Sequence, residues 1–226
     1  MSAFQSVTDT FGALKYMKES QAQVLRRLIE TNDAADILEL GFYSGKSSAY
    51  IAAILEDRGK GHLTTIDKVT ARNKKPSIMD VLSTLGLSHR VTTVFAERSY
   101  TWELARMLQR SPQPRFDLAY LDGGHTWDMT GFGFFLVDRL LRPGGIIVFD
   151  DMNWTMERSR GADWSAYPEE ERKAMGVRMV FELLVKPHGY IDLGENLECG
   201  WGIARKPPPG RVRAALLRLG RVLRRA

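Results

Sequence analysis

Short apolar runs alternate with amphipathic stretches along most of the chain. The apolar runs predict five strands, at residues 37–40, 63–66, 91–95, 116–121 and 146–149. The stretches between them predict helices at residues 47–55, 77–85, 101–108 and 130–141. Strands that alternate with helices are typical of a parallel sheet covered by helices on both faces, which is a doubly wound α/β fold.

The two ends of the chain depart from this alternation. One amphipathic helix is predicted over residues 1–30, where apolar residues recur at helical spacing: Leu14, Met17, Val24, Leu25 and Leu28. A predicted helix at 169–185 is followed by apolar runs at 190–193 and 201–204. The loop between these two runs is too short for a helical crossover, so we expect an antiparallel strand at the carboxyl end of the sheet.

Positive charge is concentrated after the last predicted strand. The formal net charge is +5, but the eight Lys and Arg residues from Arg205 onward have no acid among them, which leaves 24 basic against 27 acidic residues before them. We therefore divide the chain into a domain of residues 1–206 and a basic tail of residues 207–226. The six Arg and the spaced apolar residues of this tail predict contact with an anionic membrane surface or a partner, or else a solvated tail.

Cysteine content and hydropathy indicate the compartment. The lone cysteine, Cys199, excludes an internal disulfide and any CxxC site. No apolar run approaches the roughly 18 residues of a membrane span, and the first residues lack the pattern of a signal peptide. We expect a cytoplasmic protein.

Each of the five predicted strands has a carboxylate within a residue or two of its carboxyl end. These carboxylates are Glu39, Asp67, Glu97, Asp122, and the pair Asp150 and Asp151. In open α/β sheets the carboxyl ends of the strands form the ligand-binding edge. A single acid at such a place is often only a helix cap or a loop residue. Acids at all five ends favour a cationic ligand or a metal ion.

The first strand leads into a glycine-containing turn, and residues 39–47 read ELGFYSGKS. Gly41 and Gly45 permit a tight turn before a helix whose first backbone N–H groups are free to bind a ligand. The dinucleotide pattern GxGxxG does not fit, because Tyr43 stands where its second glycine is needed. Asp67, at the next strand end, is placed to hold both hydroxyls of a ribose.

This run resembles motif I of the class I S-adenosylmethionine-dependent methyltransferases, particularly the small-molecule O-methyltransferases of catechol type. The resemblance extends over residues 37–206 and implies a Rossmann-like sheet of seven strands, mostly parallel, with S-adenosylmethionine as cofactor. It places Gly41, Tyr43 and Ser47 along the methionine moiety, Asp67 on the ribose and Ser99 at the adenine. The full set of implied cofactor-binding residues is Glu39, Gly41, Tyr43, Gly45, Ser47, Asp67, Ser99 and Asp122.

The fourth and fifth strand ends carry the expected metal site. Close carboxylates repel one another unless a cation lies between them, and an all-oxygen set suits Mg²⁺ or another divalent cation. We predict the ligands Asp122, Asp150 and Asp151. The catechol-type enzymes have Asp-Asn at the fifth strand, whereas the Asp-Asp pair and the DGGH run here look more like macrocin-type sugar O-methyltransferases. In the alternative interpretation, Asp150 or Asp151 caps the following segment.

His125 and Asp122 are the candidate catalytic residues. An imidazole titrates near neutral pH and can take the proton of a substrate hydroxyl. The alternative is that His125 only hydrogen-bonds a loop or orients Asp122. Residues 152–168 contain Trp154, Trp164 and Tyr167 without helical periodicity, which predicts a lid over the substrate or a loop packed on the core.

These observations together predict a cytoplasmic O-methyltransferase that acts on a hydroxyl of a small molecule of sugar, polyketide or phenolic type. A divalent metal would lower the pKa of that hydroxyl. We expect no nucleic-acid partner, and a homo-oligomer is one open possibility. Two rival functions are a metal oxygenase similar to the cephalosporin hydroxylases, and a non-catalytic cofactor-binding scaffold with an interaction tail.

Overall fold

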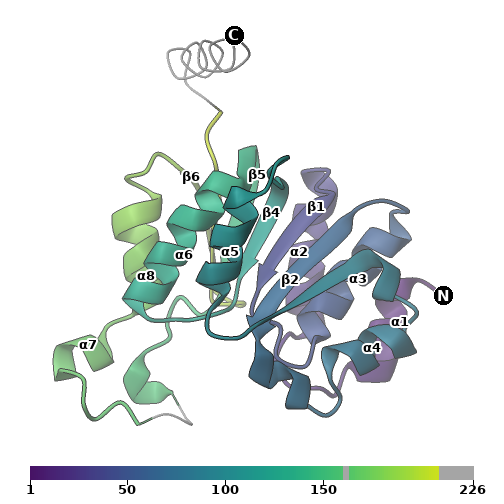
Figure 1. Cartoon of the computed structure of the whole chain (residues 1–226), viewed down its shortest axis with the longest axis horizontal. Coiled ribbons are helices and arrows are strands. Elements are labelled where there is room, and N and C mark those ends of the chain that lie inside the picture. The colour runs from purple at the N-terminus through teal and green to yellow at the C-terminus, as the bar shows by residue number, and fades with distance from the viewer. Residues whose placement is uncertain (160–162, 209–226) are drawn as a thin grey trace.

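A seven-stranded sheet lies between two layers of helices in the computed structural model, which describes residues 1–159 and 163–208 (Figure 1). The strands follow one another across the sheet in the order β3-β2-β1-β4-β5-β7-β6. Their bounds are β1 Asp36–Leu40, β2 His62–Lys68, β3 Val91–Ala96, β4 Phe116–Leu121, β5 Leu141–Phe149, β6 Ile191–Asn196 and β7 Trp201–Arg205.

Strands β1 to β5 run parallel, and β7 runs antiparallel to both β5 and β6. The predicted doubly wound, mostly parallel sheet with an antiparallel carboxyl-terminal strand is confirmed. The order of the strands reverses between β1 and β4, and such a switch point is where α/β sheets bind ligands.

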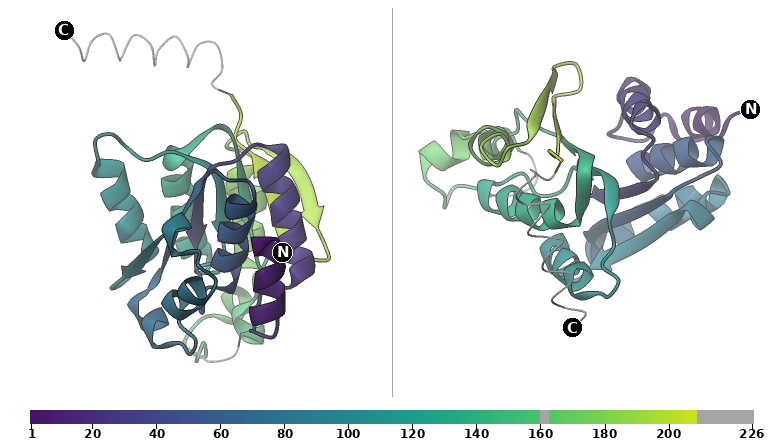
Figure 2. Two further views of the ribbon diagram at one scale, coloured as in Figure 1. Left: turned by 90° about the vertical axis from the view of Figure 1, so that its right-hand side faces the viewer. Right: turned by 90° about the horizontal axis from the view of Figure 1, so that it is seen from above.

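The helices divide between the two faces of the sheet (Figure 2). Side chains of α1 to α4 pack on one face against residues such as Ile37 and Tyr120, while those of α5, α6 and α8 pack on the other against Leu38 and Phe149. Side chains alternate between the faces of a strand, so both faces are apolar. The helices are α1 Ala3–Phe11, α2 Glu19–Thr31, α3 Lys46–Asp57, α4 Ile78–Thr84, α5 Tyr100–Gln109, α6 Trp127–Leu140, α7 Glu169–Lys173 and α8 Gly176–Val180, with 3₁₀ turns η1 Val69–Asn73, η2 Ser88–Arg90 and η3 Met156–Arg158, and a π-helical turn η4 Phe181–Val185.

The amino-terminal region differs from the single helix predicted over residues 1–30. It forms α1 and α2, and Tyr16 and Met17 between them have φ values of +63° and +22°, outside the helical range. A straight helix of thirty residues would be about 45 Å long and could not follow the surface of α3. The break allows α1 to fold onto α3, where Phe4 packs against Tyr50 with ring centroids 5.0 Å apart.

Two further segments depart from the predicted elements. Strand β5 begins at Leu141, and residues 142–145 bulge out between the pairs Phe116–Leu141 and Leu118–Ile146, so the expected turn lies inside the strand. The helix predicted at 169–185 is broken into α7, α8 and η4. The break between α7 and α8 lies at Ala174 and Met175, whose backbone is not helical. Gly176, the first residue of α8, packs so closely on the backbone of residues 125–127 that a side chain there would clash.

Within residues 1–159 and 163–208, we find no helix long and apolar enough to cross a membrane. The predicted amphipathic tail, residues 211–226, lies outside the described residues.

Candidate active site

The glycine turn after β1 is held by the carboxylate at the end of β2. Oδ2 of Asp67 accepts the backbone N–H groups of Phe42 at 2.9 Å and Tyr43 at 2.7 Å, and Oδ1 accepts that of Lys68 at 2.7 Å. Tyr43 has a φ of +50°, which is unfavourable for a residue with a side chain. A carboxylate has about four acceptor positions, so Asp67 fixes this turn and retains capacity for one further donor.

The two glycines of the turn are required by packing. A Cβ atom on Gly41 would lie 2.0 Å from the backbone oxygen of Asp122, and one on Gly45 would lie 2.6 Å from the side chain of Ile78. Both glycines also have positive φ values, +90° and +88°. Gly41 therefore brings the turn against the strand end that carries Asp122.

The amino end of α3 follows this turn directly. Gly45 is its N-cap, and among the described residues no side chain accepts a hydrogen bond from its first N–H groups. The hydroxyl-bearing residues Ser44, Ser47 and Ser48 are buried around this end. Free N–H groups at a helix amino terminus attract an anionic group such as a carboxylate.

Glu39 is fully buried beneath the turn. Its Oε2 accepts the hydroxyl of Thr65 at 2.5 Å and the hydroxyl of Ser48, whereas Oε1 has no hydrogen-bond partner in the part of the chain that the structure describes. Burial raises the pKa of Glu39 to about 7, because the charged carboxylate loses its hydration. An orphaned, buried acceptor of this kind favours a ligand that brings a donor or a positive charge.

Ser99 caps α5. Its Oγ accepts the backbone N–H of Thr101 at 3.1 Å and lies 2.8 Å from the hydroxyl of the same residue. The side chain thus has a local structural role in addition to its predicted contact with adenine, and that contact stays a prediction.

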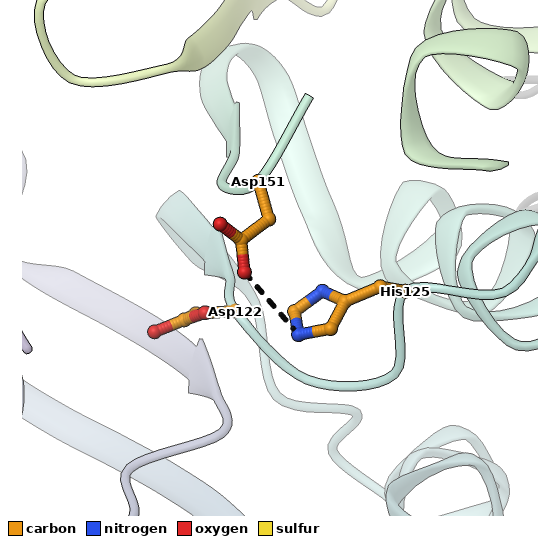
Figure 3. Close-up of side chains that lie close together, drawn as sticks. All are labelled: Asp122, His125 and Asp151. Carbon is orange, nitrogen blue, oxygen red and sulfur yellow. Dashed lines mark ion pairs between the residues drawn. The ribbon is translucent and has the colours of Figure 1, made fainter. Parts of the chain in front are cut away.

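Three side chains meet at the ends of β4 and β5: Asp122, His125 and Asp151 (Figure 3). One ligand atom from each lies within 4.8 Å of the others, and Nε2 of His125 is 3.4 Å from Oδ2 of Asp151. Burial raises the pKa of Asp122 well above its ordinary value, and the charges of Asp150 and Asp151 raise it further. Burial lowers the pKa of His125, although Asp151 opposes that change.

Asp150 does not belong to this group. Its Oδ2 accepts the hydroxyl of Tyr120, and its Oδ1 accepts the backbone N–H of Asp151 at 2.6 Å. Burial raises the pKa of Asp150 to about 6. Of the predicted metal ligands, the structure brings Asp122 and Asp151 together, adds His125, and directs Asp150 toward the buried Tyr120.

The donor set of this group fits a divalent cation. Two carboxylates and one imidazole offer oxygen and nitrogen ligands, a mixture that suits several divalent metals. Asp122 is half-buried beside two other acids without a cation at ion-pair distance among the described residues, so positive charge between Asp122 and Asp151 would be stabilised. The set differs from the all-oxygen site predicted for Mg²⁺ because it contains His125.

A pocket of about 350 Å³ opens beside His125. Its walls come from the start of α6, from the segment after β5, and from α7 and α8: His125, Thr126, Trp127, Trp154, Met156, Pro168, Glu170, Glu171, Ala174, Gly176 and Met179. The rings of His125 and Trp154 are in contact, with centroids 5.3 Å apart. The predicted lid segment therefore contributes Trp154 to this wall, while Trp164 packs behind it at 6.0 Å.

Sequence reasoning missed part of this pocket. Trp127, Glu170, Glu171 and Met179 received no functional role, although all four line it. The available signal was Trp127 itself, a tryptophan only two residues after the candidate base His125; in the structure its ring is 40% exposed. The residues of α7 and α8 carried no such signal, because they reach this pocket through packing against residues 125–127, which are far away in the sequence.

Comparison with known proteins identifies similar sequences and folds. A family model described as a methyltransferase domain matches residues 38–152, just over half of the chain. No curated protein matches the sequence.

Similar solved structures include three described as O-methyltransferases. A Staphylococcus aureus protein assigned as a caffeoyl-CoA O-methyltransferase has a TM-score of 0.68 at 21% identity, covering 91% of this chain and 93% of its own. TomG of Streptomyces achromogenes, an O-methyltransferase involved in tomaymycin synthesis and solved with S-adenosylmethionine, has a TM-score of 0.61 at 22% identity, covering 92% and 90%. The O-methyltransferase of Bacillus cereus, in complex with S-adenosylhomocysteine, has a TM-score of 0.59 at 18% identity, covering 90% and 89%. At these identities the likeness concerns the fold.

Proposed function

The chain belongs to the methyltransferase domain family, and from that premise we propose that it transfers a methyl group from S-adenosylmethionine to a hydroxyl oxygen of a small molecule. Membership confirms the predicted resemblance to the class I, S-adenosylmethionine-dependent methyltransferases. The oxygen acceptor is supported by the three structurally similar O-methyltransferases and by the group around His125.

The donor side of the site is the glycine turn. The uncapped amino end of α3 suits the methionine carboxylate, and the remaining acceptor capacity of Asp67 suits a ribose hydroxyl. The buried Glu39 and the half-buried Asp122 give the site a negative character that favours a sulfonium. When bound, S-adenosylmethionine supplies an electrophilic methyl group and leaves as S-adenosylhomocysteine.

The single observation that supports a hydroxyl as the acceptor is that His125 lies in two parts of the site at once. It belongs to the group with Asp122 and Asp151, and it also lines the 350 Å³ pocket. A hydroxyl of a molecule bound in that pocket therefore reaches a base and two carboxylates. The apolar walls, including Trp127, Trp154 and Met156, favour an acceptor with a ring or other apolar surface, of phenolic, polyketide or sugar type.

His125 is the base in this proposal. Burial lowers its pKa, so the imidazole is neutral near pH 7 and its Nε2 can take the hydroxyl proton. Asp151, 3.4 Å away, then stabilises the imidazolium. When S-adenosylmethionine is bound, the acceptor oxygen would bond to its methyl carbon as the carbon–sulfur bond breaks. A pocket that aligns the acceptor hydroxyl beside His125 would supply much of the rate.

Asp122 and Asp151 would hold a divalent cation, with His125 beside them. Such an ion would lower the pKa of the acceptor hydroxyl and so help its deprotonation. Mg²⁺ remains the predicted ion, because the two carboxylates supply oxygen ligands and His125 is kept free to act as the base.

The first experiment is calorimetric titration with S-adenosylhomocysteine, with and without Mg²⁺. We expect saturable binding of one molecule per chain, and its absence from folded protein would refute the donor assignment. A panel of phenols, polyketides and sugars is then incubated with radiolabelled S-adenosylmethionine, in Mg²⁺, Mn²⁺ or excess chelator. Label transfer that stops in chelator supports the metal, whereas oxygen consumption with Fe²⁺ and no label transfer would favour the hydroxylase-like alternative.

The expectations on partners and place in the cell remain part of this proposal. We expect a small-molecule acceptor and no nucleic-acid substrate. Cytoplasmic location and a homo-oligomer stay predictions. Contact of the tail with a membrane surface or a partner also stays a prediction. If a chain that ends at Lys206 keeps its methyl-transfer activity, the tail is not needed for catalysis.

A further inference from the structure

Lys46, the first residue of α3, is a buried cation whose partners are backbone oxygens. Its relative exposure is 6%, and its Nζ donates to the carbonyls of Gly12 at 2.7 Å, Leu14 at 2.8 Å and Tyr16 at 3.4 Å. No carboxylate of the described residues forms an ion pair with it. An ammonium group has three donors, so these three carbonyls use its full capacity.

The three carbonyls belong to the segment of residues 12–17, which joins α1 to α2. This segment contains two consecutive residues with positive φ, Tyr16 at +63° and Met17 at +22°. Residues with side chains rarely adopt that conformation, and where they do the surroundings must hold them there. Three oxygens that converge on one buried ammonium provide that restraint.

The same segment covers the glycine turn of the donor site. The ring of Tyr16 meets that of Tyr43 edge-on, with centroids 5.0 Å apart. Tyr43 belongs to the turn that Asp67 holds through its backbone N–H. Lys46 directly follows Gly45, so one residue connects the end of α3 that faces the cofactor with the segment that covers it.

We infer that Lys46 is a positioning residue for the cofactor: its ammonium fastens residues 12–17 to the amino end of α3, and Tyr16 thereby forms one wall of the S-adenosylmethionine site. This inference rests on the proposed function, because that function places the cofactor at the glycine turn. The ammonium acts through the segment, since its three donors are already used by the carbonyls.

The test compares Lys46→Ala with Lys15→Ala, in the full chain. Lys15 lies in the same segment but is exposed, and it has no partner among the described residues, so it controls for the loss of a positive charge. Hydrogen exchange of residues 12–18 without cofactor reports whether the segment is held. Calorimetry with S-adenosylhomocysteine, and kcat and KM for S-adenosylmethionine, report what the segment does.

We expect Lys46→Ala to speed exchange in residues 12–18 about tenfold and to raise Kd and KM about tenfold, as for the loss of one or two hydrogen bonds to a charged group. The value of kcat at saturating cofactor should change less than about twofold, since the variant affects uniform binding. Added n-propylammonium, which replaces the missing part of the side chain, should restore affinity, and n-propanol should not.

Tyr16→Ala is a second variant, which tests the wall directly and leaves the buried Lys46 side chain in place. Its ring is 67% exposed, so the fold should tolerate the change, and we expect Kd to rise severalfold. Unchanged Kd in both variants, in protein whose wild type binds S-adenosylhomocysteine, overturns the inference alone. Unchanged exchange in Lys46→Ala overturns it as well. A wild type that fails to bind S-adenosylhomocysteine refutes the proposed function together with the inference.

Discussion

The hydroxyl of Tyr120 donates to Oδ2 of Asp150, and this contact separates Asp150 from its neighbour Asp151. Tyr120 lies on β4, buried within the sheet, whereas Asp151 faces Asp122 and His125 at the edge. Two adjacent acids at one strand end therefore have different surroundings and, in our proposal, different roles.

Substitution of the two acids distinguishes these roles. Asp151→Asn should lower kcat about 100-fold, because it removes the carboxylate beside Nε2 of His125. Asp150→Asn should lower kcat by less than about tenfold, because its charge lies outside the group and acts only at longer range. Steady-state methyl transfer measures both. The reverse order of effects would restore Asp150 to the metal site predicted from the sequence.

Asp67 offers a test of the donor site. Asp67→Ala removes an acceptor of three backbone N–H groups, so it should abolish binding of S-adenosylhomocysteine and lower the free energy of unfolding by about 2 kcal/mol. The matched control is Asp57→Ala, because Asp57 accepts two backbone N–H groups at the start of α1. The control should lose stability and keep its affinity. Equal loss of affinity in both variants would indicate a general effect on folding.

Glu39 predicts a pH dependence of stability. Its folded pKa is about 7 against an ordinary value of 4.5, so between these pH values the unfolded chain releases a proton that the folded chain keeps. The contribution of Glu39 to stability therefore falls as pH rises from 4.5 to 7, by an amount on the order of 3 kcal/mol, and is constant above that range.

Urea unfolding at pH 5 and pH 8 measures this effect. Glu39→Gln should remove the corresponding part of the pH dependence, because the amide does not titrate. Glu97→Gln is the matched control, since Glu97 follows β3 and is exposed. The same pH dependence in wild type and Glu39→Gln would contradict the buried carboxylate.

His125 predicts a pH profile for catalysis. A base must be neutral to act, and burial lowers the pKa of His125 below its ordinary 6.5. The value of kcat should therefore rise with pH and reach its plateau already below neutrality. His125→Asn should lower kcat by about 10²- to 10⁴-fold and remove the rise of kcat with pH. His89 is exposed, so the control His89→Asn should leave kcat and its pH dependence unchanged. A profile that persists without His125 would assign the proton to another group.

The strands and the acidic edge could be predicted from the sequence for a simple reason. Each parallel strand is buried on both faces, so it appears as a continuous apolar run, and the residue that follows it necessarily lies at the carboxyl edge. Asp122 directly follows β4, and Glu39 and Asp67 are the penultimate residues of β1 and β2, so all three lie at this edge, as predicted. These acids lie near one another because the carboxyl ends of neighbouring parallel strands meet at the same edge of the sheet.

The remaining features depend on contacts between distant residues. The choice between Asp150 and Asp151 is made by Tyr120 on the neighbouring strand, and the restraint on Tyr16 is made by Lys46 on another helix. The break between α1 and α2 is hidden because apolar spacing continues across it. Local patterns carry no information on such pairings.

The switch point between β1 and β4 separates two sets of residues. The glycine turn and Asp67 belong to one side, while the pocket walls come from segments that follow β4 and β5. Under the proposed function, exchange of residues 152–176 should change acceptor preference while the glycine turn and Asp67 are left as they are. The scaffold is therefore a starting point for engineering new methyl acceptors, in which His125, which belongs both to the group with Asp122 and Asp151 and to the pocket wall, is kept.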